Sequence, residues 1–243
     1  MWALGAVGIE ETTTGLRIAF AQRELAVAAR EAFDPTAPIE TVDDAVGLDS
    51  GRDLLDVVLA GPFAVHPPWL DPPADSVALV VDPGHAFGSG SHPSTRLALT
   101  LIGDHVRAGD RVIDLGCGSG VLSLAAALVG ATVTAVDIDP AAIQATEANA
   151  RANGVAHAIT ALVGSGSRAA AVEPAPDWIV ANLTVDLHET VAPPLVPAAG
   201  AVIVAGVLVG PQSARAAVAW QRRIAVERTE GEWAGLVLRR AGQ

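Results

Sequence analysis

The chain has 243 residues, 51% of them hydrophobic, a formal net charge of −12 and a single cysteine. This length and apolar content allow one core of ordinary domain size plus a smaller appendage, and they argue against a disordered chain. The acidic charge argues against binding to nucleic acid through the phosphate backbone, the lone cysteine excludes an internal disulfide framework, and no apolar stretch is long enough for a membrane span. We therefore expect a cytoplasmic protein without a membrane segment.

The N-terminal region is expected to contain short elements of both kinds. Strand-like runs lie at Leu16–Phe20 and Pro62–Val65. Between them, a run from Gln22 to Phe33 has apolar residues at helical spacing, and Gly51–Ala60 is a second candidate helix. This mixture indicates a small α+β unit.

Proline placement suggests where this unit ends. The segment PPWLDPPAD carries paired prolines, which exclude helix and favour extended backbone. We therefore assign residues 1–66 to a small α+β domain, 67–76 to a linker and 77–243 to the main domain.

A glycine-rich loop follows the first expected strand of the main domain, Val77–Val81. The loop reads DPGHAFGSGSHPST, and Thr95 is expected to begin a helix that runs to about Val106. Glycines let the backbone approach a ligand closely, and hydroxyl groups supply short polar contacts. An ordinary flexible loop is the alternative, but its place directly before the next motif favours a functional role. His92 in this loop is predicted either to touch a ligand or to make a structural hydrogen bond.

The stretch from Val112 to Asp139 is VIDLGCGSGVLSLAAALVGATVTAVDID. It predicts a strand, a glycine turn, a helix and a second strand that ends in acidic residues, which is half of a nucleotide-binding α/β sheet. The three glycines form G-x-G-x-G, whereas a dinucleotide fingerprint has its third glycine one place later. The shorter loop suits a ligand without phosphates that lies against bare backbone, such as S-adenosylmethionine.

Three residues of this stretch have more than one interpretation. Asp137, at the end of the second strand, can accept hydrogen bonds from both ribose hydroxyls. Asp114 could bind loop amides or the ammonium group of the ligand, or could only stabilise the turn. Cys117 is predicted to be a packed side chain rather than a nucleophile.

The remaining chain alternates helices and strands. Asp139 is expected to cap a helix that ends at Gly154, and Asn182 lies at the carboxyl edge of the fourth strand, where ligands collect. The pattern predicts a mostly parallel, Rossmann-like sheet covered by helices on both faces, with a terminal antiparallel hairpin. The expected elements are strands at 158–163, 177–183, 201–208, 224–229 and 233–239, and helices at 185–196, which prolines interrupt, and 212–220.

Residues 81–240 resemble the class I S-adenosylmethionine-dependent methyltransferases, and specifically the PrmA family, which methylates large-subunit ribosomal protein eleven. The matching segments are DPGHAFGSGSHPSTRLAL, VIDLGCGSGVLSLAAALVGA, VDIDPAAIQATEANARANGV, VANLTVDLHE and EGEW. The resemblance implies methylation of amino groups on a protein, which we expect to be a basic ribosomal protein. The implied cofactor-binding residues are Thr95, Gly116, Gly118, Asp114, Asp137 and Asn182.

The N-terminal region matches this family less closely. WALGAVGIEE is similar to a segment inside the family's substrate-recruiting domain, so we expect a shortened domain or a start set too late. GRDLLDVVLAGPF stands where the family usually has tryptophans and a lysine. These departures leave the methyl-donor chemistry intact but leave the substrate open.

Methyl transfer needs a neutral amine aligned with the methyl group in a site that excludes water. Our hypothesis is that the Asn182 side chain and nearby backbone carbonyls orient this amine; a strand-end cap without a catalytic duty is the alternative. Other readings are methylation of another protein or a small amine, a nicotinamide-dependent oxidoreductase on the same sheet, and a non-catalytic cofactor-binding relative. The scattered histidines predict no metal site, and the oligomeric state is not indicated.

Overall fold

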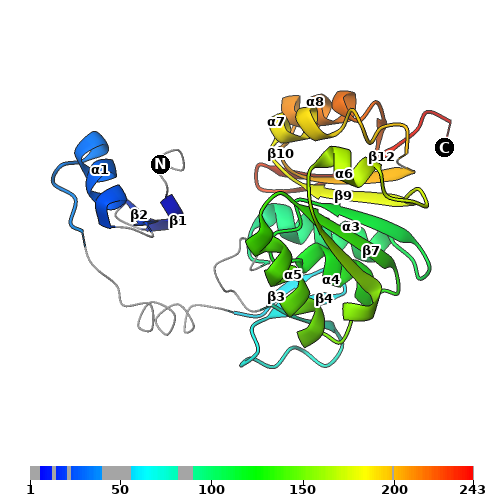
Figure 1. Cartoon of the computed structure of the whole chain (residues 1–243), viewed down its shortest axis with the longest axis horizontal. Coiled ribbons are helices and arrows are strands. Elements are labelled where there is room, and N and C mark those ends of the chain that lie inside the picture. Colours follow the sequence, from blue (N-terminus) through cyan, green and yellow to red (C-terminus); the bar gives the residue numbers. More distant parts are fainter. Residues whose placement is uncertain are drawn as a thin grey trace. The chain divides into compact units, whose positions relative to one another are not determined.

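The computed structural model of the chain describes residues 6–12, 15–20, 23–39, 56–81, 90–198 and 200–242. Contacts divide the chain into two units, Met1–Leu55 and Asp56–Gln243, which are coloured along the sequence in Figure 1.

The first unit contains two strands and a helix in its described part. Strand β1 (Ala6–Thr12) pairs antiparallel with β2 (Gly15–Phe20), and α1 (Arg23–Phe33) follows. Strand β2 and helix α1 confirm the expected strand and helix in this region, whereas β1 was not expected. The first half of the second expected helix, residues 51–55, lies outside the described residues, and its last part is wrong, because residues 58–60 form a strand.

Three short strands of the second unit form a separate small sheet. Strand β3 (Val58–Ala60) pairs antiparallel with β4 (Phe63–His66), and β4 pairs parallel with β5 (Val77–Val80). The division between the units therefore falls before the expected boundary at residue 66. The reason is that these strands bury their side chains in the core of the second unit, so residues 67–76 connect two strands of one sheet.

The main sheet confirms the expected Rossmann-like arrangement. Within the described residues it has seven strands, of which five are parallel neighbours and two form the terminal antiparallel pair. In spatial order the strands are β11 (Arg223–Glu230), β12 (Trp233–Arg239), β10 (Ala201–Leu208), β9 (Trp178–Asn182), β6 (Arg111–Leu115), β7 (Thr132–Asp137) and β8 (Ile159–Val163).

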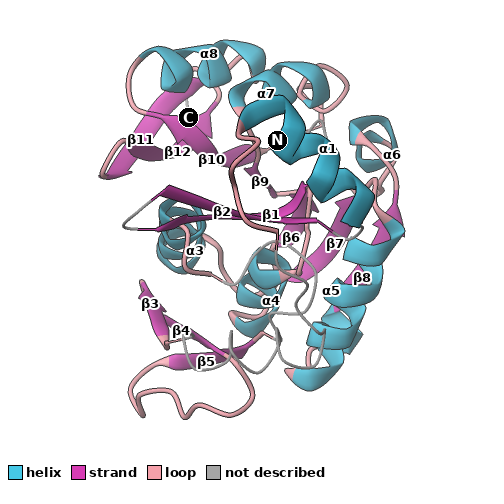
Figure 2. Cartoon of the chain, turned by 90° about the vertical axis from the view of Figure 1, so that its left-hand side faces the viewer, coloured by secondary structure: helices cyan, strands magenta, loops and turns pink. Residues whose placement is uncertain are grey.

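Helices cover both faces of this sheet (Figure 1). One face carries α3 (Pro93–His105), α4 (Val121–Leu128) and α5 (Pro140–Ala152), followed by the short 3-10 helix η2 (Ala156–Ala158); Figure 2 shows β3–β5 near α3 and α4. The opposite face carries α6 (Gly166–Ala170), α7 (Val185–Val191) and α8 (Pro211–Ala219). Alternate strand residues supply the two cores, as when Val112 packs on the α3 side and Ile113 on the α8 side.

Two helix starts show how local sequence sets the elements. Asp139 caps α5, as expected, by accepting the amide of Ala141 at 2.8 Å. Helix α3 begins at Pro93, not at Thr95 as predicted, because proline suits the first turn and His92 accepts the amide of Ser94. Thr95 therefore lies inside the first turn.

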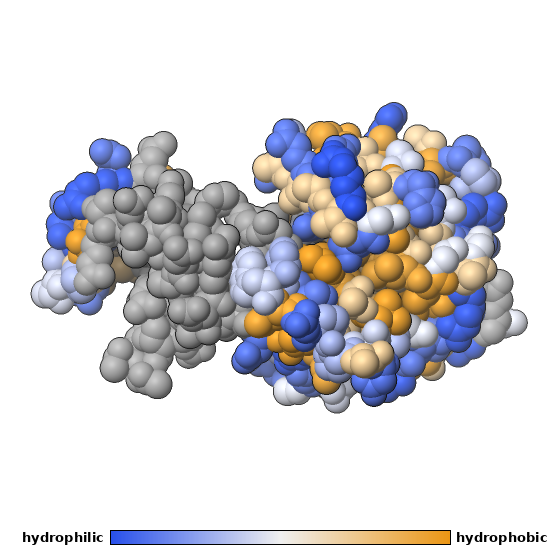
Figure 3. Space-filling view, turned by 90° about the horizontal axis from the view of Figure 1, so that it is seen from below, coloured by the Kyte–Doolittle hydropathy of each residue, from blue (hydrophilic) through white to orange (hydrophobic). Residues whose placement is uncertain are grey.

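The surface of the second unit mixes apolar and polar side chains, and Figure 3 shows apolar groups gathered on the face seen from below. Among the described residues, no helix is long and apolar enough to cross a membrane.

Candidate functional site

The candidate site lies where the strand order of the main sheet reverses. From β6 the chain moves outward through β7 to β8, and then returns to the other side of β6 as β9. Ligands of open α/β sheets bind at the carboxyl ends of the strands at such a point. The glycine loop follows β6, and Asn182 ends β9, so the structure brings these predicted residues to the same edge.

The glycine loop adopts a backbone that other residues rarely adopt. The φ angles of Gly116, Gly118 and Gly120 are +77°, +55° and +83°. A Cβ atom on Gly116 would come within 2.7 Å of Leu183 Cδ2, so a side chain there would meet the segment after β9. The amide of Gly116 donates to Val136 O at 2.8 Å, which fixes the loop beside β7. The bare loop is consistent with close approach of a ligand.

Helix α5 holds the loop from behind. The hydroxyl of Thr146 donates to Gly118 O at 3.1 Å, and the side-chain amide of Asn149 donates to Ser119 O at 2.9 Å. Cys117 is buried beside Thr146, and burial raises the pKa of its thiol to about 12. The thiol is therefore protonated near neutral pH and packed, as predicted, rather than a nucleophile.

Two backbone amides orient the carboxylate of Asp137. Gly118 N donates to Oδ2 and Asp139 N donates to Oδ1, each at 3.0 Å. A carboxylate oxygen has more than one lone pair, so both oxygens keep capacity for further donors. The half-buried carboxylate is thus held rigidly at the end of β7, as a ligand for two neighbouring hydroxyls requires.

Ile138, directly after Asp137, was missed in the sequence analysis. Its side chain is 76% exposed, and Val163 at the end of the adjacent strand β8 is 52% exposed. Two exposed apolar side chains at this edge can cover a flat, apolar ligand group. The available signal was the isoleucine between two aspartates immediately after an apolar strand.

Asp114 lies beneath the loop in an apolar environment. It is 1% exposed, and burial raises the pKa of its carboxyl group to about 6. Its Oδ2 accepts the hydroxyl of Ser123 at 2.6 Å, whereas Oδ1 has no hydrogen-bond partner among the described residues. A buried acceptor without a donor is suited to receive a cationic or donor group of a ligand.

Thr95 and Asn182 meet although 87 residues separate them. The side-chain amide of Asn182 donates from Nδ2 to Thr95 Oγ1 at 3.2 Å. Thr95 is 1% exposed in the first turn of α3, and Asn182 is half-buried at the end of β9. This bond sets the orientation of the amide and leaves its Oδ1 as the acceptor side. Residues 82–89 of the glycine-rich loop before α3 lie outside the described residues.

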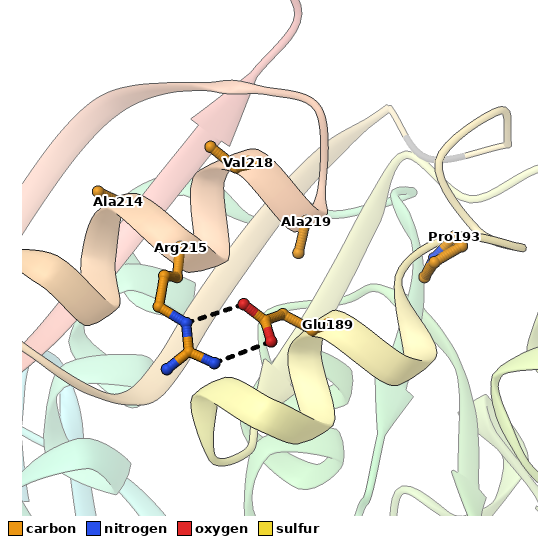
Figure 4. A pocket seen from close by; sticks show the side chains of 6 residues that line it. All are labelled: Glu189, Pro193, Ala214, Arg215, Val218 and Ala219. Atoms are coloured by element: carbon orange, nitrogen blue, oxygen red, sulfur yellow. Dashed lines mark hydrogen bonds and ion pairs between the residues drawn. The ribbon is translucent and has the colours of Figure 1, made fainter.

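One pocket of about 410 Å³ lies elsewhere, between α7 and α8 (Figure 4). Arg215 in this pocket makes ion pairs with Glu189 at 2.8 Å and with Asp186 at 2.7 Å, so its charge is already matched. None of its lining residues belongs to the predicted site. In the described part of the chain, no group of three His, Cys, Asp or Glu residues could hold a metal ion.

A family model, two relatives and one solved structure point to the same family. The family model described as "Ribosomal protein L11 methyltransferase (PrmA)" matches residues 21–241. A ribosomal protein L11 methyltransferase of Thermus thermophilus is 41% identical over 201 residues, covering 80% of this chain and 77% of that protein. A protein of the same name from Deinococcus radiodurans is 36% identical, covering 79% and 71%. The crystal structure of a ribosomal protein L11 methylase from Lactobacillus delbrueckii has a TM-score of 0.67 and 32% identity, covering 76% of this chain and 97% of that one.

Proposed function

This chain belongs to the ribosomal protein L11 methyltransferase family, and from that premise we propose that it transfers methyl groups from S-adenosylmethionine to amino groups of that ribosomal protein. The observation that carries the proposal is the hydrogen bond between Asn182 and Thr95. It joins two distant motifs beside the glycine loop, at the edge of the sheet where a methyl donor would be held.

The residues at this edge fit the separate parts of such a donor. Asp137 is oriented for the two ribose hydroxyls, and Ile138 offers an exposed apolar surface for the adenine ring. The unpartnered Oδ1 of Asp114 suits the ammonium group of the methionine part. Gly116 and Gly118 leave the backbone bare between these points, so the donor can lie against it.

Asn182 is assigned the role of orienting the amine that receives the methyl group. Because its Nδ2 donates to Thr95, its Oδ1 can accept an N–H of the amine and direct the nitrogen lone pair at the methyl carbon. The donor supplies an electrophilic methyl group on a positively charged sulfur. No protein nucleophile is required, which agrees with the buried, protonated state of Cys117. Burial of the amine favours its neutral form, which is the reactive one.

The proposed substrate is a protein, and the proposed place of the reaction is the cytoplasm, where ribosomal proteins are made. The net charge of −12 is suited to a basic protein partner. The N-terminal unit, Met1–Leu55, is proposed to recruit this substrate. Relatives that carry the name ribosomal protein L11 methyltransferase support the choice.

Mass spectrometry of unmodified ribosomal protein L11, incubated with the enzyme and S-adenosylmethionine, tests this function. We expect mass increases in whole methyl steps, abolished by Asp137→Ala. In Asn182→Ala, turnover should fall by a larger factor than the affinity for S-adenosylhomocysteine. The 243 residues contain no lysine, so every methylated lysine in the mixture comes from the substrate. Intact cofactor binding without any mass increase would refute the substrate, and full turnover by Asn182→Ala would refute its role.

A further inference from the structure

The start of α3 is tied to the tip of the terminal hairpin by one arginine. Arg96 donates from Nε to both carboxylate oxygens of Glu230, at 2.9 and 3.2 Å, and from Nη2 to Oε1. Its Nη1 donates to the carbonyl oxygen of Ser91. A single guanidinium group therefore joins the last residue of β11 to the segment that leads into α3. Such a forked contact restricts orientation as well as distance.

A ring contact beside this ion pair joins the same two elements. His92, which caps α3, meets Trp233 with ring centroids 4.6 Å apart and planes inclined by 75°. Trp233 begins β12 and pairs with Leu208 of β10, so its backbone is fixed by the main sheet. The hairpin tip thus presents a rigid surface to the first turn of α3.

That first turn carries the residue that contacts Asn182. Thr95 directly precedes Arg96, and the amides of both residues are bonded to His92 O, at 3.0 and 3.1 Å. A shift of this turn would move the Thr95 hydroxyl away from the Asn182 amide that it orients. The ion pair and the amide are therefore linked through one turn of helix.

We propose that Arg96 and Glu230 are positioning residues: their ion pair holds the first turn of α3 so that Thr95 keeps Asn182 in the orientation that methyl transfer needs. The proposal rests on the proposed function, because it concerns how Asn182 orients the substrate amine. The glycine loop and Asp137 follow β6 and β7, whereas this ion pair joins α3 to β11. Cofactor binding should therefore depend on the pair less than the transfer step does.

The chain offers a matched control. Arg228 of β11 pairs with Asp104 in the last turn of α3, with Nη2 and Oδ2 2.6 Å apart. This ion pair joins the same strand to the same helix, but about 12 Å further along the helix axis from Arg96. Breaking it removes a similar interaction without disturbing the first turn.

The kinetic experiment compares Arg96→Gln, Glu230→Gln, their double variant and Asp104→Asn. We expect kcat to fall about tenfold or more in the first two, because small displacements in an active site have effects of this size. The double variant should be about as active as Arg96→Gln, since that variant alone already loses the contact with Glu230. The Kd for S-adenosylhomocysteine should rise by a smaller factor than kcat falls, because Asp137 and the glycine loop are not joined to this ion pair. Arg96→Lys, which keeps the charge but loses the fork, should recover part of kcat. Asp104→Asn should keep kcat.

Amide hydrogen exchange of residues 94–96 gives a measurement that needs no substrate. Faster exchange in Arg96→Gln and Glu230→Gln, but not in Asp104→Asn, would support the positioning role. This holds even if the wild-type enzyme fails to methylate ribosomal protein L11, because that failure would count against the proposed function alone. Unchanged exchange, unchanged kcat, or an equal loss in Asp104→Asn would overturn the proposal.

Discussion

Replacing Asp114 with asparagine should change how stability depends on pH. The carboxyl group is 1% exposed, and burial raises its pKa from 3.8 to about 6. The native state therefore binds this proton more tightly than the unfolded state does. The stability that the protonated group contributes is fully present below about pH 4 and is lost as the pH rises through 6.

The size of the effect follows from the two pKa values. A tenfold change in proton affinity corresponds to about 1.4 kcal/mol, so the ionised native state is destabilised by about 3 kcal/mol at pH 8. An asparagine does not ionise, and its oxygen can still accept the hydroxyl of Ser123. Any cost of burying its NH₂ group is the same at every pH. The free energy of unfolding of Asp114→Asn, relative to wild type, should therefore rise by about 2 kcal/mol between pH 4 and pH 8, because the unfolded chain is already partly ionised at pH 4.

Urea denaturation across this pH range, without ligand, measures the difference. Ser123→Ala provides a control, because loss of its hydroxyl removes a hydrogen bond that lowers the Asp114 pKa and should move the transition to higher pH. Saturation with S-adenosylhomocysteine should stabilise wild type more than Asp114→Asn at pH 8, since only the carboxylate attracts an ammonium group. A difference that stays constant with pH would refute the burial argument, and equal ligand affinity would refute the ammonium contact.

Three further predictions concern the rest of the second unit. Gly116→Ala should lower Tm and ligand affinity more than Gly109→Ala does. Both positions have positive φ, but only a Cβ atom at Gly116 would meet a side chain, at 2.7 Å, so equal effects of the two variants would contradict this. Asn153→Ala should cost about 1–3 kcal/mol in urea denaturation, since its side chain exchanges two hydrogen bonds with the Val80 backbone, and an unchanged midpoint would speak against it. Burial lowers the pKa of His188, so its neutral form should stabilise the fold above pH 6.5, and this contribution should vanish as the pH falls below its lowered pKa. An ordinary histidine pKa in an NMR titration of the folded protein would disprove this.

Sequence periodicity was sufficient to predict the strands of the main sheet. Strand β10 matches its expected range of 201–208, because an unbroken apolar run of this length suits a strand buried on both faces. Residues 58–60 end the candidate helix Gly51–Ala60, yet they pair with β4 as a strand. Short apolar runs do not distinguish a strand from a helix. The choice depends on whether a partner strand is available for pairing, and the periodicity of one segment carries no information about that partner.

The candidate site was predictable in its parts but not in its contacts. Strand ends and glycine spacing located Asp137 and Asn182 at one edge of the sheet. The bond between Asn182 and Thr95 depends on how α3 packs against the sheet, which local sequence does not encode. Likewise, the unpartnered oxygen of Asp114 follows from tertiary burial, since the same residue in a looser turn would be solvated.

The position of β12 in the sheet has a consequence for when this protein becomes active. This strand is made after all the others of the sheet, yet it lies between β10 and β11. Its first residue, Trp233, and Glu230 at the end of β11 hold the start of α3. A nascent chain emerges from its N-terminal side, so the glycine loop, Asp137 and Asn182 leave the ribosome before the groups that complete their surroundings. Methyl transfer should therefore begin only after synthesis has passed Arg239, so the cofactor-binding residues are made before the enzyme can turn over.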